Sequence, residues 1–507
     1  MGRYLKATTL VAGLTLATNL LGMGREVLFA RAFGVGPEAD AYVTAFSIVA
    51  VCFLVVSAGA LQGAFMPRFQ RALVHDEPAV ALGLWRSTLW LLLGGLMLVA
   101  LALALGAKQW VAWVVPGFDG PAQAKTEYLL RWLAPMVVFV GVGSLLQSVT
   151  HAYQRFFLPS IVPLLTNVVI IVSLLLLVPK SGILGLALGT LLGAGLWLML
   201  LPGVLRELPT GEGYLPPGEL RALGMTMLPL LVLLASDQGS ALVQKALVSD
   251  LEVGSIAVLN YAAKIEGLPV GIFAAAISTV FFPALVEALS RFDRSAAVSR
   301  FVQGLGAVCF CAIPASVLLV QESHLVVQVL LQRGAFDPQA TARAAHALFW
   351  YALGILPQSL IVFINRIYFA AGDTRRPMWI GMVSATLHVL FCWGGVRVIG
   401  YLGIAIGTTL YALIYSIMLL VFLRTILPVT LPALWRAVWR AILAGGVMAG
   451  GLHCWDVPQN IAGLMLALTG GAAVYLLSSY LLGEPLLHRR PINLVRPGLS
   501  KIGMRKP

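Results

Sequence analysis

Residues 182–206 read GILGLALGTLLGAGLWLMLLPGVLR, and residues 400–424 read GYLGIAIGTTLYALIYSIMLLVFLR. Both stretches carry a Gly-x-Ala-x-Gly-Thr frame and end on arginine, 218 positions apart. The identical pairs include Gly182/Gly400, Leu184/Leu402, Gly185/Gly403, Ala187/Ala405, Gly189/Gly407, Thr190/Thr408, Leu205/Leu423 and Arg206/Arg424. Internal duplication is typical of secondary transporters, in which the substrate site lies between the two halves. The repeat therefore predicts a duplicated bundle of membrane helices.

Composition places the whole chain in a bilayer. Of its 507 residues, 59% are hydrophobic and only 11% are charged, with a mean hydropathy of +0.91. Charged residues make up about a quarter of a typical soluble domain. Runs such as 88–107 and 461–482 reach the roughly 20 apolar residues that a helix needs to cross the hydrocarbon. Continuous apolar runs favour helices over a barrel, whose strands would alternate apolar and polar residues. The expected fold is an all-α polytopic membrane protein.

About 14 transmembrane helices are expected from the apolar runs and their Gly, Pro and charge boundaries. They lie near 8–32, 40–66, 85–107, 128–152, 157–178, 182–205, 223–248, 255–286, 299–321, 344–371, 377–397, 401–423, 436–454 and 460–483. If the N-terminus is cytoplasmic, most Lys and Arg residues fall in cytoplasmic segments, which is the usual bias of inner-membrane proteins. The net charge of +13 thus reflects topology better than nucleic-acid binding. Both termini are predicted to be cytoplasmic.

The offset of the repeat sets the domain organisation. Six helices separate equivalent positions, and an even number returns each helix in the same orientation. The halves are therefore predicted to be parallel six-helix repeats. The first covers 1–206 and the second 219–424, which leaves 425–507 for two additional C-terminal helices and a basic tail.

No motif for catalysis or for a resident cofactor is present. The sequence has no nucleotide-binding loop, no HExxH and no nucleophile elbow, and its loops are too short to hold a catalytic domain. The five cysteines have no metal-ligand spacing and read as reduced packing residues. A membrane-embedded acyl- or glycosyltransferase is the enzymatic alternative, but this sequence lacks a polar loop that could serve as an active site. The sequence predicts a transporter with no catalytic residue, no metal and no cofactor.

Ionisable residues inside the spans carry most of the functional information. Each costs about 2.5–3.5 kcal/mol at the centre of a helix, so it should face a cavity or a partner. The candidates are Arg25, Glu26 and Arg31 in the first span, Asp40 at the head of the second, Asp237 in the seventh, Lys264 and Glu266 in the eighth, and Arg366 in the tenth. Arg31 and Asp40 lie near span ends, where snorkelling or a local salt bridge explains a charged residue as well as a substrate contact does. Basic residues in the first and eighth helices favour a phosphate-bearing substrate, because Arg and Lys bind phosphate strongly.

Several motifs resemble one known family. They are LLGMGREVLFARAFGVGPEADAYVTAF (20–46), VVPGF (114–118), LNYAAKIEGLPVGIF (259–273), FFPAL (281–285), LLQRGAFD (330–337) and YFAAGDTRRPM (368–378). Together they resemble the MurJ (MviN) lipid II flippases of the multidrug/oligosaccharidyl-lipid/polysaccharide exporter superfamily. The resemblance implies a bacterial inner-membrane protein that works by alternating access. It also implies that helices thirteen and fourteen form a groove for a polyprenyl tail.

The resemblance assigns roles to particular residues. Arg25 and Lys264 would hold the substrate diphosphate, with Glu26, Glu266, Arg31 and Asp40 as counter-charge or gate residues. Other cations of the family pattern are absent, since Asn19, Phe53 and Leu54 stand at their positions. A coupling-ion site would fall on Asp237, His388, Cys392 and Thr408. Because sodium prefers oxygen ligands, His and Cys there favour a proton or no coupling.

The expected function is transfer of lipid II, an undecaprenyl-diphosphate-linked peptidoglycan precursor, from the inner to the outer leaflet. Its expected partners are this lipid-linked glycan, the membrane and cell-wall synthesis proteins. Two alternatives remain open: a flippase for another polyprenyl-linked glycan, and a scaffold for envelope synthesis that transports nothing.

Overall fold

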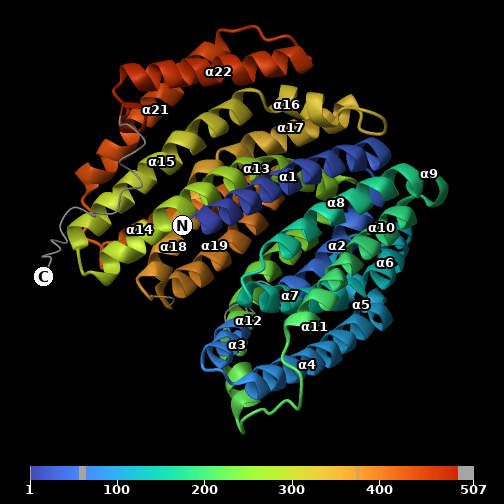
Figure 1. Ribbon diagram of the computed structural model, residues 1–507. Coiled ribbons are helices and arrows are strands. Elements are labelled where there is room, and N and C mark those ends of the chain that lie inside the picture. Colours follow the sequence, from blue (N-terminus) through green and yellow to red (C-terminus); the bar gives the residue numbers. More distant parts are fainter. Residues whose placement is uncertain (1, 56–63, 374, 489–507) are drawn as a thin grey trace, which may run out of the picture. The chain divides into compact units, whose positions relative to one another are not determined.

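The computed structural model describes residues 2–55, 64–373 and 375–488, except for the side chains of residues 2–10, 12, 54–55, 220, 226, 228–237, 275 and 279. Over these residues the chain forms helices and no strand (Figure 1). The all-α prediction is confirmed.

The helices that are long and apolar enough to span a membrane lie where the sequence predicts them. Nine spans are long and apolar enough within the described residues: Pro78–Leu105 (α4), Gly120–Ala152 (α6 and α7), Phe157–Leu176 (α8), Ile183–Glu207 (α10, η2 and α11), Ser255–Ser290 (α13, η3 and α14), Arg294–Gln321 (α15), Arg375–Ile399 (α19), Leu402–Leu423 (α20) and Ile461–Leu481 (α22). A tenth is the bent pair of α17 (Pro338–Ala352) and α18 (Ile355–Ala370). Four further long helices occupy the remaining predicted spans: α1 (Gly2–Phe33), α2 (Pro37–Val55), α12 (Glu219–Val248) and α21 (Leu431–His453). Together these account for the fourteen expected helices.

The composite spans divide into shorter elements. Their bounds are Gly120–Leu133 (α6), Met136–Ala152 (α7), Ile183–Gly195 (α10), Leu196–Leu200 (η2), Leu201–Glu207 (α11), Ser255–Pro269 (α13), Val270–Ala274 (η3) and Ala275–Ser290 (α14). Short helices connect the spans at Met66–Val74 (α3), Ala107–Val114 (α5), Val178–Ser181 (α9), Ser323–Leu331 (α16) and Pro485–His488 (α23).

The duplicated glycine frame has the same packing role in both copies. Gly182 and Gly400 both have positive φ values, 57° and 61°, just before α10 and α20, a conformation that favours glycine. A Cβ on Gly189 would lie 2.2 Å from Ser173 of α8, and a Cβ on Gly407 would lie 2.8 Å from the sulfur of Cys392 in α19. Small residues let membrane helices approach closely. The equivalence supports the duplication, whereas the boundaries 1–206, 219–424 and 425–507 stay a prediction.

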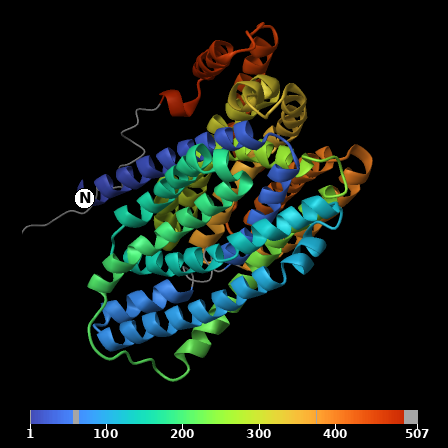
Figure 2. The same ribbon diagram turned by 90° about the vertical axis from the view of Figure 1, so that its right-hand side faces the viewer.

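The chain forms two compact units. Unit 1 comprises residues 1–268, 330–351 and 378–415. In it α8 packs against both α1 and α10, and α2 packs against α6 (Figures 1 and 2).

Unit 2 comprises residues 269–329, 352–377 and 416–507. Here α15 packs against α14, α18 and α21, and α21 packs against α22. The rings of Phe301 and Phe363 stack with centroids 6.0 Å apart. A Cβ on Gly304 would lie only 2.4 Å from Phe363, so glycine sets the spacing of α15 and α18.

Candidate functional site

A cavity of about 260 Å³ lies within unit 1 and is lined by α1, α2, α8, α10, α12 and α13. Its charged lining residues are Arg25, Glu26, Lys245 and Lys264, and Tyr42, Ser47, Gln238 and Asn260 add polar groups. The sequence-predicted residues Arg25, Glu26 and Lys264 therefore come together around one cavity. Three cations against one carboxylate give its described lining an excess of positive charge.

Arg25 is held in place by residues of α1 and α8. One of its terminal nitrogens, Nη2, lies 2.6 Å from Glu26 Oε1, and Nη1 donates to Asn167 Oδ1 at 3.2 Å. The Asn167 amide in turn donates to the backbone oxygen of Thr18 at 3.1 Å, which fixes its orientation. The Arg25 side chain is 27% exposed, whereas that of Glu26 is 10% exposed. The guanidinium is therefore oriented by its partners but still open to the cavity.

Lys245 is the cavity residue that the sequence prediction did not select. It shares one face of α12 with Gln238, Ala241 and Leu242. These four residues have i, i+3, i+4 and i+7 spacing, and all four line the cavity. Its ammonium interacts electrostatically with both Asp40 and Lys264. The available signal in the sequence was a lysine inside the apolar seventh span.

Among the described residues, the other ionisable candidates of the sequence do not line this cavity. Arg31 is exposed in the last turn of α1 and does not line the cavity. Glu266 is 5% exposed and is also not a lining residue. It follows Lys264 by two positions on α13, about 200° around the helix, and so cannot share its face. Arg366 lies in unit 2, where it lines a small cavity with Phe281 and Phe363.

Asp40 caps a helix. Its carboxylate accepts hydrogen bonds from the backbone N–H groups of Gly254 at 2.6 Å and Ala257 at 2.7 Å, at the start of α13. These amides have no partner within their own helix, so a carboxylate there satisfies them and complements the helix dipole. Asp40 is 5% exposed. This buried cap joins α2 to α13.

A close contact of three chain segments surrounds this cap. We call residues 31–40, 252–257 and 333–336 the three-segment contact. Tyr261 donates to the backbone oxygen of Gly34 at 3.0 Å, and the Ala335 N–H donates to the backbone oxygen of Arg31 at 2.9 Å.

Three glycines with positive φ make the three-segment contact possible. They are Gly34, Gly254 and Gly334, with φ values of 55°, 86° and 64°. Cβ atoms on them would lie 2.1 Å from the Ala335 oxygen, 2.2 Å from Val35 and 2.4 Å from the Arg31 oxygen, respectively. Side chains at these positions would separate the segments.

Two of the predicted ion-coupling residues, His388 and Thr408, form a second polar cluster with Gln244 in unit 1. His388 Nε2 lies 3.0 Å from the Thr408 hydroxyl and 3.4 Å from the Gln244 amide nitrogen. The imidazole stacks on Tyr411 with ring centroids 4.4 Å apart, and Cys392 is buried. The side chain of Asp237 lies outside the described residues. Within the described part of the chain no group of three or more His, Cys, Asp or Glu residues could hold a metal ion.

Comparison with known structures identifies the fold. The fold matches a multidrug resistance MATE family transporter of the MOP superfamily in its inward-facing conformation, with a TM-score of 0.71 and 13% identity over 81% of this chain and 94% of that one. It also matches a lipid II flippase MurJ in an inward closed conformation, with a TM-score of 0.80 and 22% identity over 94% of this chain and 100% of that one. The chain therefore shares the fold of these two polytopic membrane proteins.

Sequence comparison identifies the family. The model of the family described as lipid II flippase MurJ matches residues 29–465. Relatives include the probable lipid II flippase MurJ of Borreliella burgdorferi, 25% identical over 81% of both chains, and the lipid II flippase MurJ of Burkholderia cenocepacia, 27% identical over 79% of this chain and 80% of that one. The chain belongs to the MurJ family of lipid II flippases. It is accordingly a multi-pass inner-membrane protein of a transporter family.

Proposed function

We propose that this protein moves lipid II from the cytoplasmic to the outer leaflet, with its diphosphate held by Arg25, Lys245 and Lys264. The observation that supports this most is the cationic cavity of unit 1 in a chain of the MurJ family. The diphosphate concentrates negative charge on the phosphate oxygens that Arg and Lys bind strongly, and it is common to all lipid II molecules.

The three cations have complementary roles in this proposal. Arg25 offers a planar fork that can bind two phosphate oxygens at once, and its orientation is set by Glu26 and Asn167. The two lysines act as point charges from α12 and α13. Glu26 limits the repulsion between the cations while the cavity is empty, and it competes with the substrate phosphate for Arg25. The headgroup can therefore bind and also be released.

Alternating access requires a seal that can open. We assign that role to the three-segment contact, with Asp40 as its central hydrogen-bond acceptor and the backbone of Arg31 as a second. With both termini cytoplasmic, this contact lies at the outer end of unit 1. The seal rests on backbone hydrogen bonds and glycine contacts, which can break and re-form together. Substrate that binds the opened state better would shift the population toward it.

The cluster of His388, Thr408 and Gln244 supports a proton more than sodium as a coupling ion, if one is used. Imidazole nitrogen is a weak ligand for sodium, which prefers oxygen. Partner proteins of cell-wall synthesis would bind outside this cluster and the cavity.

A second candidate cargo is another polyprenyl-diphosphate-linked glycan. It is favoured by Asn19, Phe53 and Leu54, which stand where the family pattern has basic residues. The lipid that accumulates when the gene is deleted, identified by mass spectrometry, distinguishes the two cargoes.

Complementation tests the proposed function. The chain should restore growth to bacteria depleted of their own lipid II flippase, and Arg25→Ala or Lys264→Ala should abolish the rescue at equal membrane levels. Arg131→Ala and Lys180→Ala are matched controls, because both side chains are exposed and lie outside the cavity. Failure of the wild-type chain to rescue would contradict the cargo assignment. Rescue by both cavity variants would contradict the site assignment.

A further inference from the structure

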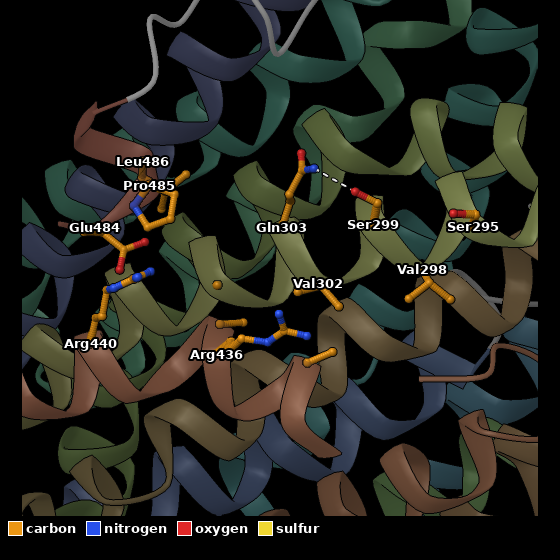
Figure 3. Close-up of a pocket in the computed structure, with 13 residues that line it drawn as sticks. Ser295, Val298, Ser299, Val302, Gln303, Arg436, Arg440, Glu484, Pro485 and Leu486 are labelled. Carbon is orange, nitrogen blue, oxygen red and sulfur yellow. Dashed lines mark hydrogen bonds between the residues drawn. The ribbon is translucent and has the colours of Figure 1, made fainter. Parts of the chain in front are cut away.

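A second and larger cavity lies within unit 2. It measures about 540 Å³ and is bounded by α15, α21 and the segment Glu484–Leu486, which follows α22 (Figure 3). Its polar lining residues are Ser295, Ser299, Gln303, Arg436, Arg440 and Glu484, and the rest of its lining is apolar or glycine. Its volume falls within the roughly 300–1,000 Å³ of small-molecule sites. None of its lining residues belongs to the cavity of unit 1.

Two arginines one helical turn apart give this cavity its charge. Arg436 and Arg440 extend from α21 along one wall, while Ser295, Ser299 and Gln303 follow α15 (Figure 3). Arg436 is exposed and donates through Nε to the backbone oxygen of Pro432 at 3.2 Å. Among the described residues, neither arginine has an ion-pair partner within 4.0 Å, and the buried Nε of Arg440 has no hydrogen-bond partner. The cavity therefore holds cationic groups whose hydrogen-bonding capacity is not filled by the described protein.

Glu484 is the one acidic lining residue. It is 5% exposed, and Arg440 lies close enough to interact with it electrostatically. In Figure 3 the Arg440 side chain points toward Glu484, whereas Arg436 lies farther along the cavity. Even with Glu484 ionised, the two arginines leave an excess positive charge. Arg436 is thus the cation available to an anion from outside.

The hydroxyl and amide groups on α15 complete a set of donors. Gln303 donates to the Ser299 hydroxyl oxygen at 3.1 Å, which leaves the Ser299 hydrogen free to point into the cavity. Ser295 lies one turn earlier on the same helix. Two guanidinium groups with hydroxyl donors opposite them match the several acceptor oxygens of a phosphate group.

We propose that this unit 2 cavity binds a phosphate-bearing anion, either the headgroup of an anionic phospholipid or a soluble phosphate. The apolar part of the lining accommodates a glycerol backbone and the first acyl carbons. Basic pockets between membrane helices at the cytoplasmic side commonly bind anionic headgroups. The site is separate from the lipid II cavity, so it does not depend on the proposed function.

Native mass spectrometry of the full chain tests this proposal. The protein is released from nanodiscs that contain phosphatidylcholine alone, or phosphatidylcholine mixed with phosphatidylglycerol or cardiolipin. A lipid site predicts retention of the anionic lipid over phosphatidylcholine, lowered at least tenfold by Arg436→Gln and less by Arg436→Lys. Binding of inorganic phosphate or pyrophosphate in phosphatidylcholine nanodiscs, with the same dependence on Arg436, would identify a soluble ligand.

Two controls keep the outcome interpretable. Arg131→Gln removes an exposed arginine elsewhere and should leave retention unchanged, and Arg25→Ala should leave it unchanged although it abolishes flipping. Arg436 is exposed, so its replacement should not unfold the protein, which a thermal melt checks. Equal retention of all lipids together with no binding of phosphate or pyrophosphate, or no effect of Arg436→Gln on any ligand, would overturn the proposal.

Discussion

Replacing Asp40 with alanine should loosen the three-segment contact without disturbing the rest of unit 1. The change removes the acceptor for two backbone N–H groups, those of Gly254 and Ala257, at 2.6 and 2.7 Å. A hydrogen bond to a charged group contributes about 1.5–3 kcal/mol. Because water can reach the freed amides once the segments part, we take about 2–3 kcal/mol for the pair. At about 1.4 kcal/mol for each factor of ten, the opened state becomes about 30- to 150-fold more populated.

Hydrogen exchange measured by mass spectrometry reads this change directly. Amides that are protected only by local contacts exchange through local opening, so their rates follow the opening equilibrium. In Asp40→Ala the amides of residues 252–258 should exchange faster by the factor given above, while those of α10 stay unchanged. Asp40→Asn should have a smaller effect, because its amide oxygen still accepts hydrogen bonds.

A matched cap provides the control for this prediction. Asp119 also caps a helix, accepting from the Ala122 N–H at 2.9 Å, but it is exposed and lies outside the three-segment contact. Asp119→Ala should speed exchange only at the start of α6. If Asp40→Ala leaves residues 252–258 as protected as in the wild type, the assignment of Asp40 as the central acceptor of the seal is wrong.

Three further predictions concern the cavity of unit 1 and the packing of unit 2. Lys245→Ala should weaken lipid II retention in native mass spectrometry at least tenfold, and Lys245→Arg should restore most of it; unchanged retention in the alanine variant would remove Lys245 from the site. Gly304→Leu should lower the free energy of unfolding by at least about 1–3 kcal/mol, because the new leucine side chain would meet Phe363. Gly446→Ala should be neutral, because a Cβ at position 446 would face open space. Thermal melts that place both variants at the wild-type Tm would refute this account of the packing. Burial raises the pKa of Glu484 above its usual 4.5, although Arg440 opposes the shift. A carboxyl group with a raised pKa in the folded state adds stability that is complete below pH 4.5 and is lost as the pH rises through the folded-state pKa. Glu484→Gln should therefore lose this pH dependence and should be more stable than the wild type above the folded-state pKa. Parallel pH profiles of Tm for the two proteins would contradict this prediction.

The fold was largely predictable from the sequence because membrane helices are set by length and hydropathy. The Gly185/Gly403 and Gly189/Gly407 pairs, which revealed the repeat, pack tightly in both copies in the structure. Such signals are local, since each depends on a short run of residues. They specify which segments become helices and where helices approach closely, but not which faces meet around a cavity.

The candidate site was predictable only in part. Arg25 and Glu26 both lie deep in an apolar span, so a cavity or a partner could be expected for each, but their contact is seen only in the structure. Lys245 was not selected, because its place beside Lys264 depends on how α12 packs against other helices. The capping role of Asp40 depends on residues more than 200 positions away, which no local pattern reveals. The cavity of unit 2 likewise combines three distant segments.

The most direct test of the central claim is flipping of purified lipid II by the full chain reconstituted in liposomes. Lipid II on the outer surface is measured with a probe that does not cross the membrane. The account predicts that wild-type protein equilibrates lipid II between leaflets, that Arg25→Ala and Lys264→Ala stop this transfer, and that Arg131→Ala does not. Equal transfer by wild-type protein and both cavity variants would contradict the claim that these cations hold the diphosphate. Absence of transfer by folded wild-type protein, with or without a proton gradient, would contradict the proposed function itself.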